Sequence, residues 1–131
     1  MTQEYINILQ NELCMRMRYK VMVECNGKTL TICRYDCNGR FELSDGTITS
    51  CVNIKPYLRP MYTMTPEERK HYESFWFSYN DPDDSYPDLL DPDSALSLYD
   101  WLNENHFDYR YLIDKGYALC APKTMYNIQQ I

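Results

Sequence analysis

The spacing of apolar residues changes from helical to alternating within the first 25 positions. Three apolar residues fall on one face of a helix predicted over residues 2–15, and Thr2 can cap its start. The three are Ile6, Leu9 and Leu13. From about residue 19 the period becomes two and ends at Asn26-Gly27, a dipeptide typical of a tight hairpin. The pattern therefore predicts a helix followed by an antiparallel sheet.

The turn at residues 26 and 27 fixes which residues face each other on its two strands. It places Val23 opposite Leu30, so apolar side chains meet on one face and polar ones on the other. The further predicted pairs are Val21 with Ile32, Glu24 with Thr29 and Met22 with Thr31. This hairpin is the first of a predicted meander.

Two more turn dipeptides, Asn38-Gly39 and Asp45-Gly46, extend the meander. The expected strands cover about 19–25, 28–36, 40–44 and 47–54, and the last turn places Leu43 opposite Ile48. A sheet of this size either closes into a small SH3-like barrel or is covered by helices, because its apolar face must be buried.

Prolines mark the end of the meander and the start of the next helix. Pro56 and Pro60 predict that residues 55–60 leave the sheet as a turn or a short 3₁₀ helix. Thr65 and Glu68 form a capping box around Pro66, which predicts a helix over 66–77. Its aromatic residues are expected to dock on the sheet or on later helices; they are Tyr72, Phe75 and Trp76.

The C-terminal third alternates loop and helix signals. Residues 80–94 contain six Asp, three Pro and no basic residue, which is typical of an exposed loop. A helix is predicted from Asp91-Pro92 to about Asn105, and a short one over 109–115 that Gly116 ends. The remaining stretch, 117–131, is expected to lie extended against the body. The whole reads as one α+β domain, with a helix and meander in 1–60 and two or three packed helices in 61–131.

Composition and charge narrow the classes of molecule that the chain could bind. The net charge is −6, divided into +2 over residues 1–60 and −8 over 61–131. This acidic balance argues against nucleic-acid binding unless the basic meander is presented alone. The chain has no apolar run that could cross a membrane and no signal peptide, so we expect a cytoplasmic protein. The 13 tyrosines suit both core edges and recognition surfaces.

Six cysteines raise the question of disulfides or zinc. Without a secretory context we expect free thiols. Cys25, Cys33, Cys37 and Cys51 could gather at one end of the meander, but only Cys33 and Cys37 have the close spacing of a zinc-binding pair. We therefore expect no metal there.

Catalytic and calcium signatures are also weak. The acidic loop over 81–93 lacks the glycine and glutamate positions of a calcium-binding loop. His106, Asp108 and Cys120 are the residue types of a thiol nucleophile with its base, yet their surroundings match no nucleophile motif. His106 is instead expected to end the preceding helix, as a cation facing its C-terminal dipole. We expect no catalytic centre and no cofactor.

Two stretches carry a resemblance to a known group of proteins. They span residues 53–68, with the run Lys-Pro-Tyr-Leu-Arg-Pro at 55–60, and 100–126, with Asp-Trp-Leu-Asn at 100–103 and His-Phe-Asp-Tyr-Arg at 106–110. In this combination the chain resembles a family of short uncharacterised proteins common in Bacteroidales gut bacteria, their phages and integrated elements. The resemblance implies an origin in such elements and a domain plan, but no reaction.

These observations favour a non-enzymatic protein-interaction or regulatory module, with another protein as its partner. Five residues form the candidate contact surface, although Arg–carboxylate pairs are often structural, which favours the alternative that these residues buttress the join between sheet and helices. They are Tyr57, Arg59, His106, Asp108 and Arg110. Two alternatives remain: a small hydrolase or nucleotide-handling enzyme built on the helical half, and nucleic-acid binding through the basic meander.

Overall fold

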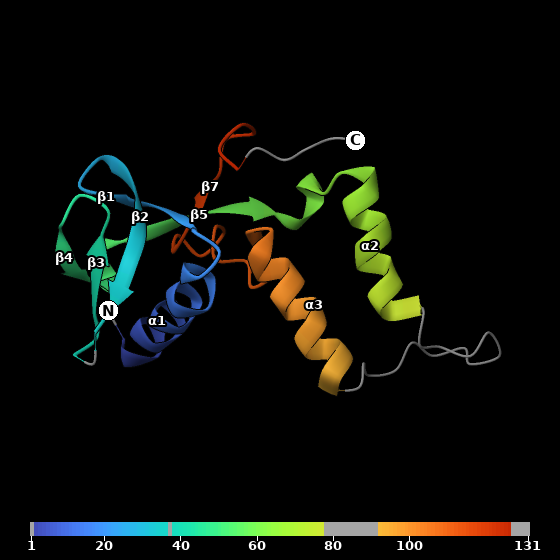
Figure 1. Cartoon of the computed structure of the whole chain (residues 1–131), viewed down its shortest axis with the longest axis horizontal. Coiled ribbons are helices and arrows are strands. Elements are labelled where there is room, and N and C mark those ends of the chain that lie inside the picture. Colours follow the sequence, from blue (N-terminus) through green and yellow to red (C-terminus); the bar gives the residue numbers. More distant parts are fainter. Residues whose placement is uncertain (1, 37, 78–91, 127–131) are drawn as a thin grey trace.

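The chain folds as an α+β structure in which a strand meander and two helices are joined by one long strand (Figure 1). The structure is a computed structural model that describes residues 2–36, 38–77 and 92–126. The expected fold class is confirmed. Residues 80–91 of the predicted acidic loop and the chain's last five residues lie outside the described residues, while 92–94 belong to a helix.

Helix α1 (Gln3–Met17) forms as the apolar spacing predicts. The Thr2 hydroxyl accepts a hydrogen bond from the Tyr5 N–H at 3.2 Å, so Thr2 is the N-cap. Leu9 and Leu13 are fully buried against the sheet, in a core they share with Phe41 of the meander. The apolar stripe of α1 therefore closes one face of the meander.

The meander consists of β1 (Met22–Cys25), β2 (Lys28–Tyr35), β3 (Arg40–Leu43) and β4 (Ile48–Ser50). The first hairpin has the predicted register, with Val23 opposite Leu30. Val21 does not join this ladder, which starts at Met22 opposite Thr31. Lys20 adopts a positive φ of 60°, which turns the chain just before Val21 and shortens the strand.

The predicted register of the last hairpin is wrong by one residue. Ile48 pairs with Glu42, not with Leu43. The Leu43 N–H donates to the Thr47 carbonyl at 2.8 Å, and Gly46 has a φ of 90°, so the loop holds three residues instead of two. Because one residue changes the face of a strand, Ile48 is exposed.

The prediction that residues 55–60 leave the sheet is also wrong, because they form β5 (Lys55–Pro60). This strand pairs with β1, with β6 (Phe107–Asp108) and with β7 (Leu119–Cys120). The Arg59 N–H donates to the His106 carbonyl. Because the N–H groups of successive residues in a strand point to opposite edges, this is not the edge toward which the nitrogens of Pro56 and Pro60 point. The missing proline N–H groups are therefore not needed for pairing with β6. The expected 3₁₀ turns flank the strand instead, as η1 (Cys51–Asn53) and η2 (Met61–Thr63).

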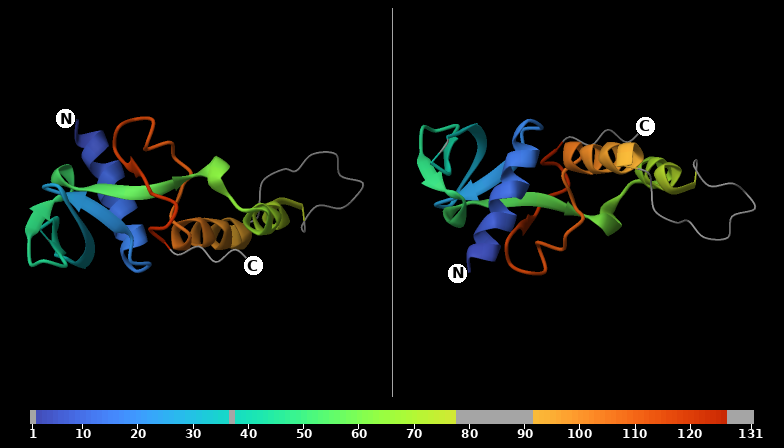
Figure 2. Two further views of the ribbon diagram at one scale, coloured as in Figure 1. Left: turned by 90° about the horizontal axis from the view of Figure 1, so that it is seen from above. Right: turned by 90° about the horizontal axis from the view of Figure 1, so that it is seen from below.

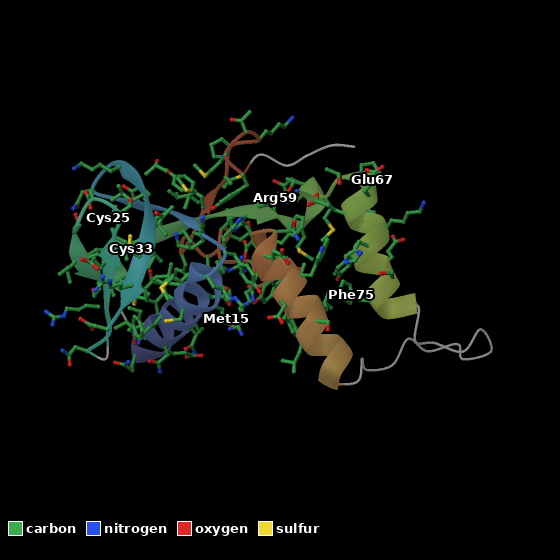
Figure 3. All side chains as sticks on the ribbon, viewed as in Figure 1. Met15, Cys25, Cys33, Arg59, Glu67 and Phe75 are labelled. Carbon is green, nitrogen blue, oxygen red and sulfur yellow. The ribbon has the colours of Figure 1, made fainter. Side chains whose placement is uncertain are left out.

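Helix α2 (Pro66–Phe77) has the predicted bounds. The Glu68 N–H donates to the Thr65 hydroxyl at 3.1 Å, and the Thr65 N–H donates to a Glu68 carboxylate oxygen at 2.9 Å. This reciprocal pair is the capping box. Phe75 points from α2 toward α3 (Pro92–Glu104; Figure 3) and packs with Tyr72 against the cluster that contains the buried Leu98 and Leu102 of α3.

Helix α3 (Pro92–Glu104) buries Leu98 and Leu102 against Phe107, forming a second and smaller apolar cluster beyond the main core. Strand β5 runs from the meander to this cluster, and the views from above and below show it linking the two ends of the molecule (Figure 2). None of the helices among the described residues has the length and apolar character that crossing a membrane requires.

The short helix predicted over 109–115 does not form, and turns take its place. The Asp108 carboxylate accepts hydrogen bonds from the Leu112 and Ile113 N–H groups at 2.8 and 3.0 Å. Tyr111 has a φ of 58°, which interrupts any helix at that point. Gly116 has a φ of 81°, but no helix precedes it, so its predicted role as the residue that ends one is wrong.

Of the stretch predicted to lie extended, only Leu119–Cys120 do so, pairing with β5 as β7, whereas residues 123–126 form a turn and 127–131 lie outside the described residues. A single phenol then continues this contact. The Tyr126 hydroxyl donates to the Tyr57 carbonyl at 2.6 Å and accepts from the Met22 N–H at 2.9 Å. It thereby links β1 to β5 next to the residues at which the two strands pair directly.

Candidate functional site

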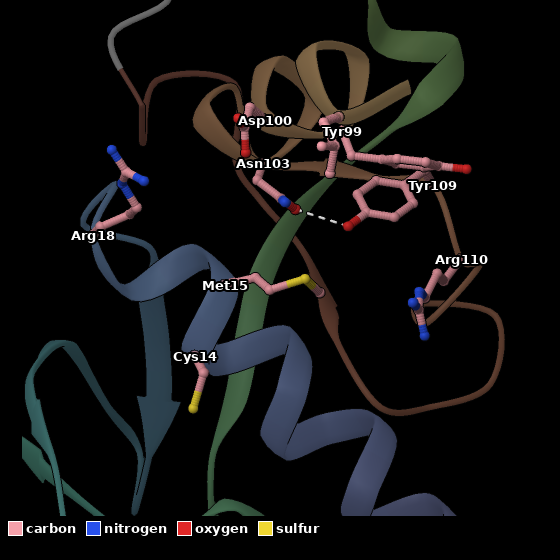
Figure 4. Close-up of a pocket in the computed structure, with 9 residues that line it drawn as sticks. Cys14, Met15, Arg18, Tyr99, Asp100, Asn103, Tyr109 and Arg110 are labelled. Atoms are coloured by element: carbon pink, nitrogen blue, oxygen red, sulfur yellow. Dashed lines mark hydrogen bonds between the residues drawn. The ribbon is translucent and has the colours of Figure 1, made fainter. Parts of the chain in front are cut away.

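A groove of about 510 Å³ lies between α1, α3 and the turn after β6 (Figure 4). Its lining includes large apolar side chains and two arginines. The residues are Cys14, Met15, Arg18, Leu96, Tyr99, Asp100, Asn103, Tyr109 and Arg110. The volume is within the usual range for a binding pocket.

The α1 wall of the groove follows from helical spacing. Arg18 lies three positions after Met15 and four after Cys14, so the three project from one side of α1, next to the stripe buried against the sheet. Met15 faces α3 and is 36% exposed (Figures 3 and 4).

The α3 wall is a second stripe of the same helix that buries Leu98 and Leu102. Its members lie at positions i, i+3, i+4 and i+7, which is one helical face. They are Leu96, Tyr99, Asp100 and Asn103. Leu96 is 65% exposed and Tyr99 is 48% exposed, although both are large and apolar. Helix α3 thus has one apolar face in the second cluster and another open to the groove.

Tyr109 connects the two walls. Its hydroxyl donates to Asn103 Oδ1 at 2.9 Å, and its ring centroid lies 5.3 Å from that of Tyr99. The Arg16 guanidinium lies over the Tyr109 ring, 5.1 Å from its centroid. Burial, followed by the charge of Glu12, raises the pKa of Tyr109, so its hydroxyl stays a hydrogen-bond donor at neutral pH.

A buried ion network supports the groove from behind. Glu12 and Arg16 are both fully buried and pair at 3.0 Å. The other carboxylate oxygen of Glu12 lies 2.9 Å from Arg110 Nε, and Arg16 Nη2 donates to the Phe107 carbonyl at 2.7 Å. Because a buried charge is costly when unpaired, this network holds α1 and the turn after β6 in fixed positions.

The five residues of the expected contact surface do not form one surface. Arg59, His106 and Asp108 are buried, Tyr57 is half-buried and Arg110 is exposed. Arg59 binds both carboxylate oxygens of Glu68, at 2.6 and 2.8 Å, and so ties β5 to α2. Arg59 thus buttresses the join between sheet and helices, as the alternative interpretation expects, whereas Asp108 binds the backbone of the turn after β6. Arg110 alone lines the groove.

His106 does not end α3 as a cation. Burial, together with the positive charges of Arg16 and Arg59, lowers its pKa to about 4, so the imidazole is neutral at pH 7. Its φ of 64° turns the chain after α3, and its ring stacks on the Tyr126 ring. The dipole interpretation fails because His106 is buried and too close to the two arginines to become a third cation.

The other two candidate catalytic residues are Asp108 and Cys120, and their surroundings are those of structural residues. Asp108 accepts two backbone hydrogen bonds, and Cys120 is exposed on β7. The described cysteines are free thiols, as expected, while Cys37 lies outside the described residues. Within the described ranges, no three His, Cys, Asp or Glu residues gather closely enough to hold a metal ion.

The sequence-based reasoning missed most of the groove. Leu96 and Tyr99 are apolar residues outside the expected core stripe of α3, and Met15 lies outside that of α1. This position outside the expected core stripes was the signal by which the sequence could have indicated the groove. The sequence gives no sign that the two offset stripes face each other.

No protein-family model, curated protein or solved structure matches the chain. The resemblance to the Bacteroidales and phage family therefore stays a prediction.

Proposed function

We propose that this chain is a non-enzymatic protein-interaction module that binds its partner in the groove between α1 and α3. The observation that carries the proposal is the convergence of Met15, Leu96 and Tyr99, three exposed large apolar side chains, on one hollow. Apolar side chains gathered in this way, next to polar residues, are typical of interaction sites. Methionine, tyrosine and arginine are also enriched at the centres of protein interfaces.

Catalysis in the groove is less well supported. Burial, followed by the nearby Cys51, raises the pKa of Cys14, the groove's one thiol, and a protonated thiol is a poor nucleophile. The groove lining contains no histidine, and its one carboxylate is the exposed Asp100. These residues provide recognition groups instead of a base and an activated nucleophile.

Nucleic-acid binding through the meander is also less well supported, because its basic residues are already paired. In three ion pairs of the meander, a carboxylate oxygen lies 3.3 to 3.6 Å from a side-chain nitrogen of lysine or arginine. They are Lys28 with Asp45, Arg34 with Glu42 and Arg40 with Asp36. Phosphate binding would have to displace these carboxylates.

Affinity capture from the native host tests the proposal when it is done with matched variants. We expect a reproducible protein partner that is lost with Leu96→Asp, because the new charge lies within the apolar part of the groove. Tyr62→Asp is the control, since Tyr62 is 81% exposed and lies outside the groove. A partner that both variants retain equally would contradict the proposed site.

The same proposal includes an origin in phages or integrated elements. The resemblance at residues 53–68 and 100–126 supports it. Integrase, capsid or conjugation genes beside this gene would be the expected finding, and a conserved metabolic operon would contradict it.

A further inference from the structure

We propose that the groove takes a short acidic amphipathic helix from its partner. One large apolar side chain of that helix enters between Met15, Leu96 and Tyr99, and two flanking carboxylates bind Arg18 and Arg110. This inference rests on the proposed function and adds to it the chemistry of the partner. It is carried by the charges at the groove and by their spacing along α1.

The groove is cationic within an acidic protein. Its lining holds two arginines and one aspartate, a net charge of +1, whereas the whole chain has −6. Arg18 is exposed; its guanidinium lies over the Tyr19 ring, 5.0 Å from the centroid, but it has no carboxylate partner among residues 2–36, 38–77 and 92–126. An anionic ligand would supply this missing partner.

Arg110 is already held in position for a second carboxylate. Its Nε atom lies 2.9 Å from Glu12, while its side chain remains 47% exposed. A guanidinium carries five N–H donors, so the Nη groups can bind a ligand while Nε keeps its contact with Glu12. Because Glu12 already restricts this side chain, binding costs less conformational entropy.

The two arginines set a distance for the ligand. Arg110 is held beside Glu12, and Arg18, the C-cap of α1, lies six positions after Glu12, which corresponds to about 9 Å of backbone along the helix axis. Figure 4 shows the two arginines at opposite ends of the groove with Met15 between them. Two acidic residues seven positions apart on a helix are separated by about 10 Å and leave room for an apolar residue midway.

The occupant is a short segment and not a highly acidic surface. The residues outside the groove carry a net −7, so an extended anionic partner would be repelled around the site. A segment of two or three turns places its carboxylates on the arginines and little charge elsewhere. The cleft between two helices also suits a third helix, whose apolar ridge packs between them.

Selection from a random peptide display library tests the inference without a known partner. The intact chain is the target, and the Leu96→Asp chain is used to remove peptides that bind elsewhere. We expect the enriched peptides to share one large apolar residue flanked by two acidic residues. Their affinity is then measured by fluorescence anisotropy with a labelled consensus peptide.

Arginine variants separate the charge contacts from the groove itself. We expect Arg18→Ala and Arg110→Ala each to weaken the consensus peptide about three- to tenfold, with weaker binding at higher salt. Arg34→Ala, an exposed arginine of the meander, should leave the affinity unchanged. Arg18 has no buried partner, so its variant remains a fair test even where loss of Arg110 disturbs Glu12.

The outcomes distinguish the two proposals. Groove-dependent peptides that lack acidic residues, or that ignore both arginine variants, would overturn the acidic-helix inference and leave the interaction module standing. An oligonucleotide that displaces the peptide in an Arg18-dependent manner would also overturn the inference. Failure to enrich any peptide that distinguishes the intact chain from Leu96→Asp would count against the proposed function itself.

Discussion

The ring of Tyr126 lies flat against the ring of His106, with centroids 3.7 Å apart and planes inclined by 17°. This stack, together with the Tyr126 hydroxyl between Met22 and Tyr57, fixes the C-terminal stretch to both β1 and β5. The groove depends on the same region, because Phe107 and Tyr109, one and three positions after His106, contact Arg16 of α1, and Tyr109 also binds Asn103 of α3.

Removal of the Tyr126 hydroxyl should destabilise the fold. In Tyr126→Phe, the Met22 N–H and the Tyr57 carbonyl both lose their hydrogen-bond partner, so we expect a loss of about 1–2 kcal/mol. Chemical denaturation checks this value. The control is Tyr62→Phe, whose ring is 81% exposed and which should unfold like the parent. Equal midpoints for the two variants would contradict the role of Tyr126.

Protonation of His106 should make stability depend on pH. Its pKa is about 4 in the folded chain and about 6.5 in the unfolded chain, so between these values the unfolded chain binds the extra proton. Stability should therefore fall as the pH drops from about 6.5 to about 4, by up to about 3 kcal/mol, and this contribution should level off below.

A comparison of histidine variants isolates this effect. Asparagine tolerates the positive φ at position 106 and does not titrate, so His106→Asn should flatten the pH dependence over that range. His71→Asn, at the exposed histidine of α2, is the matched comparison. Parallel curves for all three proteins would show that His106 does not titrate as its surroundings require.

The Glu68 carboxylate should contribute more to the stability of the fold than the carboxylate of Glu67, its neighbour in the sequence. Burial alone would raise the pKa of Glu68, but hydrogen bonds from Arg59 and Thr65 outweigh it and lower that pKa. Glu68→Gln weakens the link to the buried Arg59 and should cost about 1–3 kcal/mol. The matched variant Glu67→Gln changes an exposed carboxylate on the same turn, and thermal unfolding should place it near the parent. A reversed order would contradict the role of Glu68 in joining β5 to α2.

The described thiols should differ in reactivity. Cys33 and Cys120 are exposed, whereas Cys25 and Cys51 are buried, and burial raises the pKa of both buried thiols. Titration of the native protein with a chromogenic disulfide should therefore lose one fast-reacting thiol in Cys33→Ser and one in Cys120→Ser. Cys51→Ser should leave the number of fast-reacting thiols unchanged, and a loss in this variant would contradict the packing of η1 against α1.

Local signals predicted those elements whose determinants lie close together in the sequence. The capping box at Thr65 and Glu68 and the turn at Asn26-Gly27 are each contained in a few residues, and both are confirmed. The predicted register of the last hairpin was wrong because Asp45-Gly46 is compatible with both a two-residue turn and a three-residue loop that ends in glycine.

Long-range contacts explain the other failures. β5 forms because β1, β6 and β7 all pair with it, although its prolines disfavour a strand. His106 is neutral because the fold buries it and brings Arg16 and Arg59 close to it, and the Tyr126 hydroxyl contacts the Met22 N–H across 104 positions. The groove combines residues of α1, α3 and the turn after β6, so no local pattern could predict it, although Arg110 was named among the contact residues.

Nuclear magnetic resonance mapping of the intact, isotope-labelled chain tests the central claim most directly. When a groove-selected peptide is added, amide and methyl signals should shift around Met15, Leu96 and Tyr99, with the Nε signals of Arg18 and Arg110 shifting alongside them. Shifts confined to the meander, with the signals of α1 and α3 unchanged, would contradict the groove as the binding site.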